Sequence, residues 1–377
     1  MISNFLLLSY IFVTIIEAHQ ELVSVHVIFR HGDRAPSNPY PMDPYGIEYW
    51  PNGWSQLTEL GAYQTNELGT YLRLQYGEKY QLIEEKYNPK KVIIRATSKK
   101  RAIDSAKNLI HGLYKPEENV THDDSIDIKV EGSYKQDLLL KPNSVVCDRY
   151  ERTAKAENMV LFQAYNLRFA SFFKYLSFYT GYDVSMDNIE HVFDAVFRET
   201  VHGLPQPAWL NTTFKLDKDH PEIPVYDTIL ELKRVQRLSE FNSEWKSKLR
   251  TGFLLGDIVQ RLRRISHGAN EANLVIYSSH DATLTALLYN MGVSNELLVP
   301  YAAAIIFELY HDTDSLNYFV KVLYRNETTH SPYELQVIPK STIFSLKDFT
   351  IAMAPKMYIK KEEYFDDCAI VVKENII

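Results

Sequence analysis

The sequence predicts an α/β fold with a mixed, mainly parallel β-sheet, helices on both faces of the sheet and an inserted α-helical cap. Short apolar segments rich in Val, Ile and Phe alternate with amphipathic segments near both ends of the chain. The pattern of residues 153–248 is instead almost wholly helical. With 377 residues, of which 45% are hydrophobic, the chain can bury a large core.

The first 18 residues have the pattern of a secretory signal peptide. Residues 5–16 are apolar but too few to cross a bilayer comfortably, and Ala18 offers a small residue for cleavage. A buried N-terminal strand is the alternative, but residues 21–29 already fill that place. Because no later segment reaches membrane length, we expect a soluble, secreted protein, with the lysosomal lumen as another location.

The N-terminal half of the core is predicted to alternate between strands and helices. Residues 22–29 form a buried strand that ends at Arg30, and residues 40–52 form a loop rich in Pro, Tyr and Gly. Thr58 caps a helix that reaches Leu72. A second strand at residues 91–95 and a second helix at residues 101–113 follow, which together indicate a parallel sheet.

The C-terminal half continues this pattern after the cap. Residues 252–265 predict an amphipathic helix, residues 274–277 a strand and residues 282–288 a helix. Late strands are expected at residues 303–310, 318–324 and 335–338, around a polar turn at residues 312–315. The core thus comprises residues 19–152 and 249–377, and the cap comprises residues 153–248.

Polar clusters follow three of these strands. They are residues 30–34, residues 95–97 and residues 278–281. Ligands of open α/β sheets bind beyond the carboxyl ends of the strands, so we expect these clusters to converge there. A histidine between two arginines can accept a phosphoryl group, because guanidinium forks match phosphate oxygens and offset their charge.

Two motifs resemble those of the histidine acid phosphatases, the RHGxRxP motif and a late HD motif. They read here Arg30-His31-Gly32-Asp33-Arg34-Ala35-Pro36 and His280-Asp281. Residues 53–61 and the frame R-[SA]-T-x-x-x-R-[TA] at residues 95–102 extend the likeness over nearly all of the mature chain. The resemblance implies a phosphoglycerate mutase-like fold. It also implies a secreted acid phosphatase of the prostatic, lysosomal or venom type that cleaves phosphomonoesters through a covalent phosphohistidine.

The resemblance also implies roles for individual residues. His31 is the nucleophile and Asp281 the proton donor, whereas the phosphate is bound by Arg30, Arg34, Arg95 and His280. A surface ion pair is the alternative role for Arg95. Since Asp281 must be protonated to act as an acid, we expect an acid pH optimum.

Other polar residues of these segments are expected to be structural. We assign Arg101 to a helix face or to support of its neighbours, Asp33 to orienting nearby groups, and the cap segment 199–209 with His202 to packing. No cofactor is implied. No metal is expected either, since three arginines around one centre would repel a divalent cation, and chelators should leave activity intact.

Cysteines and sequons agree with export. Cys147 and Cys368 are the only cysteines and are expected to form one disulfide, with two buried free thiols as the alternative. Mammalian members of the family usually carry more cysteines. Asn119, Asn211 and Asn326 begin N-glycosylation sequons.

Several alternatives remain open at this point. A phytase or inositol polyphosphate phosphatase would keep the fold and change the substrate, and a catalytically silent secreted binding protein would keep the fold alone. The expected partner is a small-molecule or protein phosphomonoester. A homodimer would agree with the family, whose members are often dimers. The net charge of -7 argues against a nucleic-acid partner, and no membrane anchor is visible.

Overall fold

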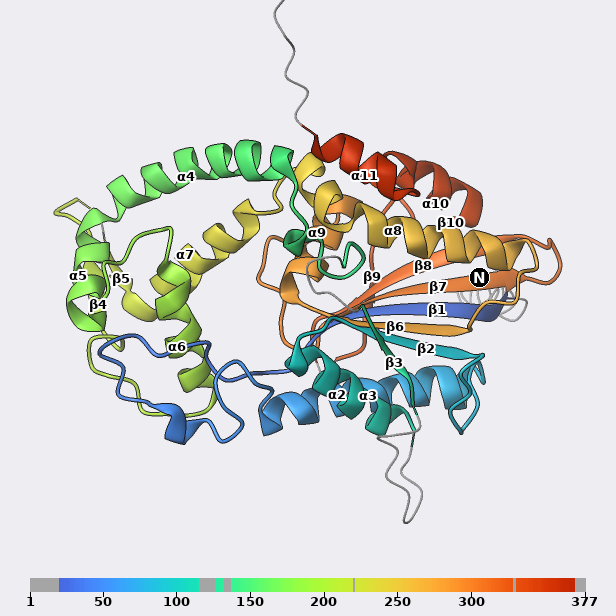
Figure 1. The fold of residues 1–377 in the computed structure, drawn as a ribbon, viewed down its shortest axis with the longest axis horizontal. Helices are drawn as coiled ribbons and strands as arrows, with labels where there is room; N and C mark the ends of the chain where they lie inside the picture. Colours follow the sequence, from blue (N-terminus) through green and yellow to red (C-terminus); the bar gives the residue numbers. More distant parts are fainter. Residues whose placement is uncertain (1–19, 115–125, 132–136, 220, 328–329, 370–377) are drawn as a thin grey trace, which may run out of the picture.

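The computed structural model describes residues 20–114, 126–131, 137–219, 221–327 and 330–369 (Figure 1). Their main sheet has the strand order β10-β8-β7-β1-β6-β2-β3, with β9 paired to β8. The strands are β1 (Gln20–Arg30), β2 (Val92–Ala96), β3 (Ile128–Val130), β6 (Leu274–Ser279), β7 (Ala304–Asp312), β8 (Tyr318–Arg325), β9 (Tyr333–Glu334) and β10 (Ile343–Ser345).

The sheet is mixed, as predicted. Strands β1, β6, β2 and β3 run parallel, and β7, β8, β9 and β10 extend the sheet in antiparallel pairs. Every residue of β6 is buried, as expected for a parallel strand covered on both faces. The strand predicted at residues 335–338 is wrong. The pairing with β8 involves Tyr333 and Glu334, and it ends after the N–H of Leu335 donates to the carbonyl oxygen of Val322 at 2.7 Å. Pro339 has no N–H to extend a ladder, and Ile338 makes an isolated bridge with Ser341.

Helices cover both faces of the sheet (Figure 1). On one face lie α2 (Glu59–Leu72) and α3 (Lys100–Leu113), and on the other lie α8 (Glu244–Ser266), α9 (Asp281–Met291) and α10 (Leu346–Met353). Side chains of β1 alternate between the two cores: Val27 and Phe29 pack in the cluster that contains α2 and α3, and Ile28 packs in the other. Because the side chains of β1 point alternately to two buried faces of the sheet, most of its residues are apolar.

Two glycines bring α2 and α3 into backbone contact. A Cβ atom at Gly69 would lie 1.9 Å from the carbonyl oxygen of Leu109, and one at Gly112 would lie 2.0 Å from that of Asn66. Since no side chain fits at either position, the close approach of the two helices depends on glycine.

The helical cap has its own core (Figure 1). It contains α4 (Lys155–Arg168), α5 (Ala170–Thr180), α6 (Ile189–Val201), α7 (Val225–Ser239) and a hairpin of β4 (Thr213–Lys215) and β5 (Glu222–Pro224). Tyr40, from the loop after β1, is buried in this core. The predicted cap boundary at residue 248 falls inside α8. This helix begins beside α4, where Lys246 pairs with Glu157 at 2.9 Å, and continues unbroken onto the sheet.

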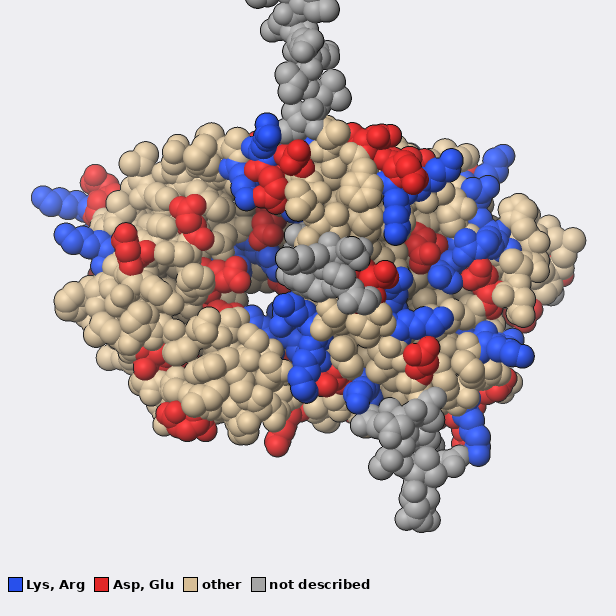
Figure 2. Space-filling model, in the orientation of Figure 1, with Lys and Arg blue, Asp and Glu red and all other residues tan. Residues whose placement is uncertain are grey.

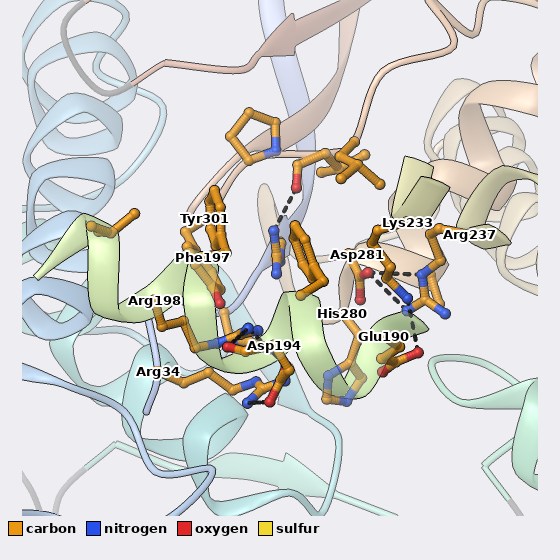
Figure 3. A pocket seen from close by; sticks show the side chains of 18 of the residues that line it. Arg34, Glu190, Asp194, Phe197, Arg198, Lys233, Arg237, His280, Asp281 and Tyr301 are labelled. Carbon is orange, nitrogen blue, oxygen red and sulfur yellow. Dashed lines mark hydrogen bonds and ion pairs between the residues drawn. The ribbon is translucent and has the colours of Figure 1, made fainter. Parts of the chain in front are cut away.

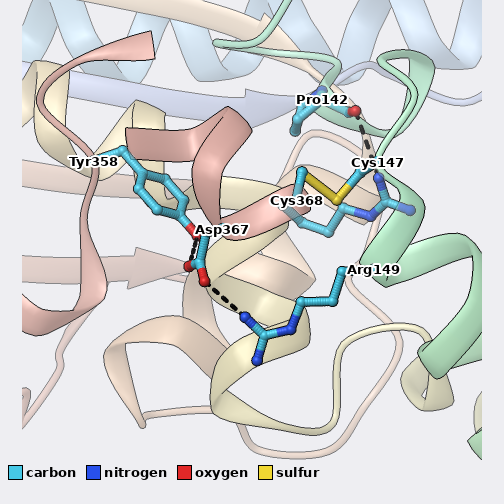
Figure 4. Close-up of a disulfide and its surroundings, with 7 residues drawn as sticks. Pro142, Cys147, Arg149, Tyr358, Asp367 and Cys368 are labelled. Atoms are coloured by element: carbon cyan, nitrogen blue, oxygen red, sulfur yellow. Dashed lines mark hydrogen bonds and ion pairs between the residues drawn. A yellow bond between two sulfur atoms is a disulfide. The ribbon is translucent and has the colours of Figure 1, made fainter. Parts of the chain in front are cut away.

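The predicted disulfide between Cys147 and Cys368 is confirmed (Figure 4). It joins the segment before α4 to the end of α11 (Lys361–Cys368), and the two Cα atoms lie 4.9 Å apart. Arg149 donates to Asp367 at 2.7 Å beside the bridge. The bridge thus ties the C-terminal helix to the start of the cap.

The features expected of an exported chain are only partly visible. The signal segment 1–18 and Asn119 lie outside the described residues. Asn211 is exposed and Asn326 is partly exposed. Within the described ranges, no helix combines the length and the apolar composition that crossing a bilayer requires.

Candidate active site

The polar clusters after β1, β2 and β6 meet at one edge of the sheet. Arg30 pairs in register with Ser279, and Ala96 pairs with Ser278, so the three strands end together. The rings of His31 and His280 lie 5.4 Å apart, and the Thr97 hydroxyl is hydrogen-bonded to Nε2 of His280 at 2.9 Å. The parallel register therefore produces the convergence that the sequence predicted.

His31 is buried and held in one orientation. Its Nδ1 lies 2.8 Å from the carbonyl oxygen of Gly32, so Nδ1 is assigned the proton. Nε2 then carries the lone pair and accepts from Nε of Arg101 at 3.0 Å. Burial, with the positive charge of Arg101 and the neighbouring His280, holds the pKa of His31 well below its usual range. The imidazole is therefore neutral and has a nucleophilic nitrogen.

The loop that carries His31 is in backbone contact with α2. A Cβ atom at Gly32 would lie 2.1 Å from the carbonyl oxygen of Gly61, and one at Gly61 would lie 2.1 Å from that of Asp33. The N–H of Gly32 donates to the hydroxyl of Ser105 on α3 at 3.1 Å. Both helices on this face of the sheet thus fix the position of the nucleophile.

Two of the predicted phosphate ligands flank His31. Arg30 donates to the carbonyl oxygen of Val299 at 2.5 Å, and its guanidinium carbon lies 3.8 Å from the centre of the Tyr301 ring. Arg34 donates to both carboxylate oxygens of Asp194, at 2.7 and 3.4 Å. Both arginines line the same cavity as His31 and His280.

The structure places Arg101, and not Arg95, beside His31. Arg95 pairs with Glu131 at 2.8 Å and with Asp137 at 3.3 Å, and in the part of the chain that is described it does not line the cavity. Ile93 packs in the core beneath α8, and Arg95 shares its side of β2, facing away from α3. Arg101 lies in the first turn of α3, lines the cavity and contacts His31.

The cap supplies ion pairs that sequence reasoning missed. Asp194 on α6 is buried and accepts from Arg34, from the N–H of Ser37 at 2.5 Å, and from Arg198 at 2.7 Å. Burial opposes its ionisation, but Arg198 and Arg34 outweigh burial and lower the pKa of Asp194 to about 2. The spacing of Asp194 and Arg198, one helical turn apart, was the only available signal, and it does not point to Arg34.

Asp281, the expected proton donor, lies in an ion pair. Nε and Nη2 of Arg237 on α7 donate to its Oδ2 at 2.9 and 2.8 Å (Figure 3). Burial would raise the pKa of Asp281, but Arg237 and Arg30 hold it well below the usual range. The free site therefore holds Asp281 as a carboxylate, and sequence reasoning did not identify Arg237.

Asp33 and His202 connect the core to the cap. The buried carboxylate of Asp33 accepts from the hydroxyl of Thr58 at 2.6 Å and lies 2.7 Å from Nε2 of His202. Thr58 is also the N-cap of α2. These contacts fit the orienting role expected of Asp33 and the structural role expected of His202.

The cavity has a volume of about 770 Å³, within the range of small-molecule sites. Figure 2 shows basic side chains around the hollow between cap and core, and Figure 3 shows cap residues facing the strand ends. Its floor carries His31 and the arginines, whereas an apolar wall is formed by Phe193, Phe197, Val201, Leu230, Leu298, Val299 and Pro300. Asn326, a sequon residue, also lines the cavity.

The structure offers no candidate metal centre among the described residues. No group of three or more His, Cys, Asp or Glu side chains is placed there so that it could hold an ion. The guanidinium groups of Arg101 and Arg30 act on His31, and that of Arg34 acts on Arg101. This arrangement suits an anion.

Comparison with known proteins places these residues in a family context. A sequence model described as the histidine phosphatase superfamily (branch 2) matches residues 21–325. The lysosomal acid phosphatase of Bos taurus is 31% identical over 355 residues, which cover 89% of this chain and 79% of the relative. The prostatic acid phosphatase of Bos taurus is 30% identical, over 93% of this chain and 88% of the relative.

Solved structures show the same fold. The phytase of Citrobacter braakii superimposes with a TM-score of 0.66 at 17% identity, over 93% of this chain and 100% of the phytase chain. The Hafnia alvei phytase in complex with myo-inositol hexakis sulphate has a TM-score of 0.68 at 15% identity, over 94% and 99% of the two chains. At these identities the likeness concerns the fold alone.

Proposed function

The chain belongs to branch 2 of the histidine phosphatase superfamily, and from this membership we propose that it is a secreted acid phosphatase that forms a phosphohistidine at His31. One observation carries the proposal: the Nε2 lone pair of His31 faces a cavity in which Arg30, Arg34 and Arg101 gather positive charge. The curated relatives of this chain are named acid phosphatases, which assigns the chain to the phosphomonoester hydrolases.

In the first step, Nε2 of His31 attacks phosphorus while the bond from phosphorus to the ester oxygen breaks. Arg101, which donates to Nε2 in the free site, turns its N–H to a phosphate oxygen, where Arg30 and Arg34 also donate. The proton on Asp281 moves to the leaving oxygen. This step leaves a phosphohistidine, a free alcohol and an Asp281 carboxylate.

In the second step, water attacks phosphorus and the bond to Nε2 of His31 breaks. Asp281 accepts one proton of the water, and inorganic phosphate leaves. The cycle requires Asp281 to carry a proton when the ester binds. Because the surrounding arginines favour the carboxylate, that condition is met in acid, and an acid pH optimum follows.

The cavity favours esters that carry a single phosphate over the polyanion phytate. Outside the arginine cluster, cationic cap residues already have carboxylate partners: Lys233 pairs with Glu190 at 2.8 Å and Arg237 pairs with Asp281. Phe193, Phe197 and Leu230 of the cap add apolar surface to the wall. We expect an aryl phosphate to be cleaved faster than phytate, and the ratio of kcat/KM on the two substrates tests this.

Secretion is part of the proposal. The signal-like residues 1–18, the three sequons and the disulfide between Cys147 and Cys368 support it, and the curated relatives carry lysosomal and prostatic names. Transfer of the expressed chain to the medium, with loss of residues 1–18 on N-terminal sequencing, is the expected result.

The decisive experiment traps the intermediate. Rapid mixing with a ³²P-labelled ester, followed by an alkaline quench in which a phosphohistidine survives, should leave label on His31. His31→Ala should lose both the label and at least about 10³-fold of its kcat on an aryl phosphate at about pH 5. Equal activity of His31→Ala and wild type would reject the nucleophile. A protein that binds phosphate but releases none would be the silent binding alternative.

A further inference from the structure

Arg237 is placed to control the candidate proton donor. We propose that Arg237 is a positioning residue that confines leaving-group protonation by Asp281 to acidic solution. The proposal rests on the proposed function, which assigns proton donation to Asp281. Its geometric basis is a pair of hydrogen bonds. Nε and Nη2 of Arg237 both donate to Oδ2 of Asp281, at 2.9 and 2.8 Å (Figure 3).

The charges around Asp281 come from several elements, and most are positive. Arg237 and Lys233 face it from α7, Arg30 from β1 and Arg101 from α3. Lys141, from the segment before the cap, Arg34, from the loop after β1, and the neighbouring His280 also act on it. Among these groups Arg237 is the largest source of positive charge acting on Asp281, and it is the one that donates hydrogen bonds to it.

A second carboxylate keeps Arg237 in place when Asp281 is protonated. Nη1 of Arg237 donates to Oε1 of Glu240, the residue that caps the C-terminal end of α7, at 2.9 Å. The side chain of Glu240 is 35% exposed, and that of Asp281 is 25% exposed. The guanidinium therefore retains one anionic partner while the other gains a proton, so protonation of Asp281 does not leave this partly buried cation without an anionic partner.

The consequence depends on the leaving group. An alkyl alkoxide is too basic to leave without the proton of Asp281, whereas a nitrophenolate leaves without one. Loss of the Arg237 charge should let Asp281 keep its proton to higher pH. Cleavage of alkyl phosphates should then extend toward neutrality, and cleavage of aryl phosphates should not.

The test compares kcat/KM for glycerol 2-phosphate and 4-nitrophenyl phosphate from about pH 2.5 to pH 8, since this ratio reports the free enzyme and the first chemical step. The scan starts in strong acid because the pKa of Asp281 is held well below its usual range. In Arg237→Gln, which keeps hydrogen-bonding capacity without charge, the alkaline limb for glycerol 2-phosphate should move up by about one pH unit or more. The limb for 4-nitrophenyl phosphate should stay in place. Arg237→Met should behave like Arg237→Gln.

Two controls separate charge from fold. Arg237→Lys keeps the charge and should retain the wild-type limb, and Arg234→Met removes an arginine of the same helix that pairs with Glu231 and should also retain it. An unchanged alkaline limb for glycerol 2-phosphate in both Arg237→Gln and Arg237→Met would overturn the inference.

Asp281→Asn tells the two proposals apart. It should lower kcat/KM for glycerol 2-phosphate by about 10²-fold more than for 4-nitrophenyl phosphate. Equal losses on both esters would reject Asp281 as the proton donor. The expected difference, together with an unmoved limb in the Arg237 variants, would reject only the role of Arg237.

Discussion

The arginine that contacts the nucleophile should be distinguishable from the arginine that does not. Arg101→Ala removes a donor next to Nε2 of His31, and we expect kcat/KM on an aryl phosphate to fall by about 10²-fold. Arg95→Ala removes the partner of Glu131 and Asp137 and should change kcat/KM by less than about threefold, because among the described residues Arg95 does not line the cavity. The reverse ranking in steady-state assays would restore Arg95 to the site.

The difference between these two arginines shows where sequence reasoning stops at the scale of residues. The motif around His31 and the His280-Asp281 pair predicted residues of the cavity floor, because the carboxyl ends of parallel strands lie at the same edge of a sheet. Both arginines fit the same sequence frame, and only the side toward which each element turns its side chain separates them. Asp194, Arg237 and Tyr301 depend on contacts between distant segments, which leave no local pattern.

At the scale of elements, the C-terminal part of α6 should make the fold more stable in acid. Glu199 is buried near Asp43, and burial together with the negative charge of Asp43 raises the pKa of Glu199 to about 8. A carboxyl whose pKa is raised on folding stabilises the native state below its unfolded pKa. That contribution is lost as pH rises through the folded value.

Glu199→Gln removes this titration. Between about pH 5 and pH 8, Tm of the wild type should fall more than Tm of the variant, by at least about 2 °C. Differential scanning calorimetry checks the difference, with Glu231→Gln on α7 as an exposed control. Parallel Tm curves for wild type and Glu199→Gln would contradict the assignment.

Elements with strong periodicity were predictable, and short ones were not. The buried strands β1 and β6 and the helices that follow β1 and β2 were expected from their apolar patterns. The strands β3, β4, β5 and β10 have three residues each, too few to show alternation. The start of α8 at Glu244 was missed because its first turns contain few apolar residues.

At the scale of the molecule, the disulfide should carry a measurable share of stability. Cys147 and Cys368 are separated by 221 residues, and a bridge that closes so long a loop restricts the unfolded chain. The double variant Cys147→Ala and Cys368→Ala should lose about 2–5 kcal/mol of unfolding free energy in urea titrations. Wild type under a reducing agent should match it, and an unchanged urea midpoint would show that the bridge is dispensable.

Cap and core are joined at several places, and this has a kinetic consequence. Helix α8 passes from one to the other without a break, Tyr40 is buried in the cap, and Asp194 and His202 contact the loop after β1. A cap attached to the core at several separate points has no single hinge about which it could rotate. The cavity is therefore preformed, and kcat should be insensitive to viscogens such as sucrose, whereas a lid that had to open would slow turnover in proportion to the friction of the solvent.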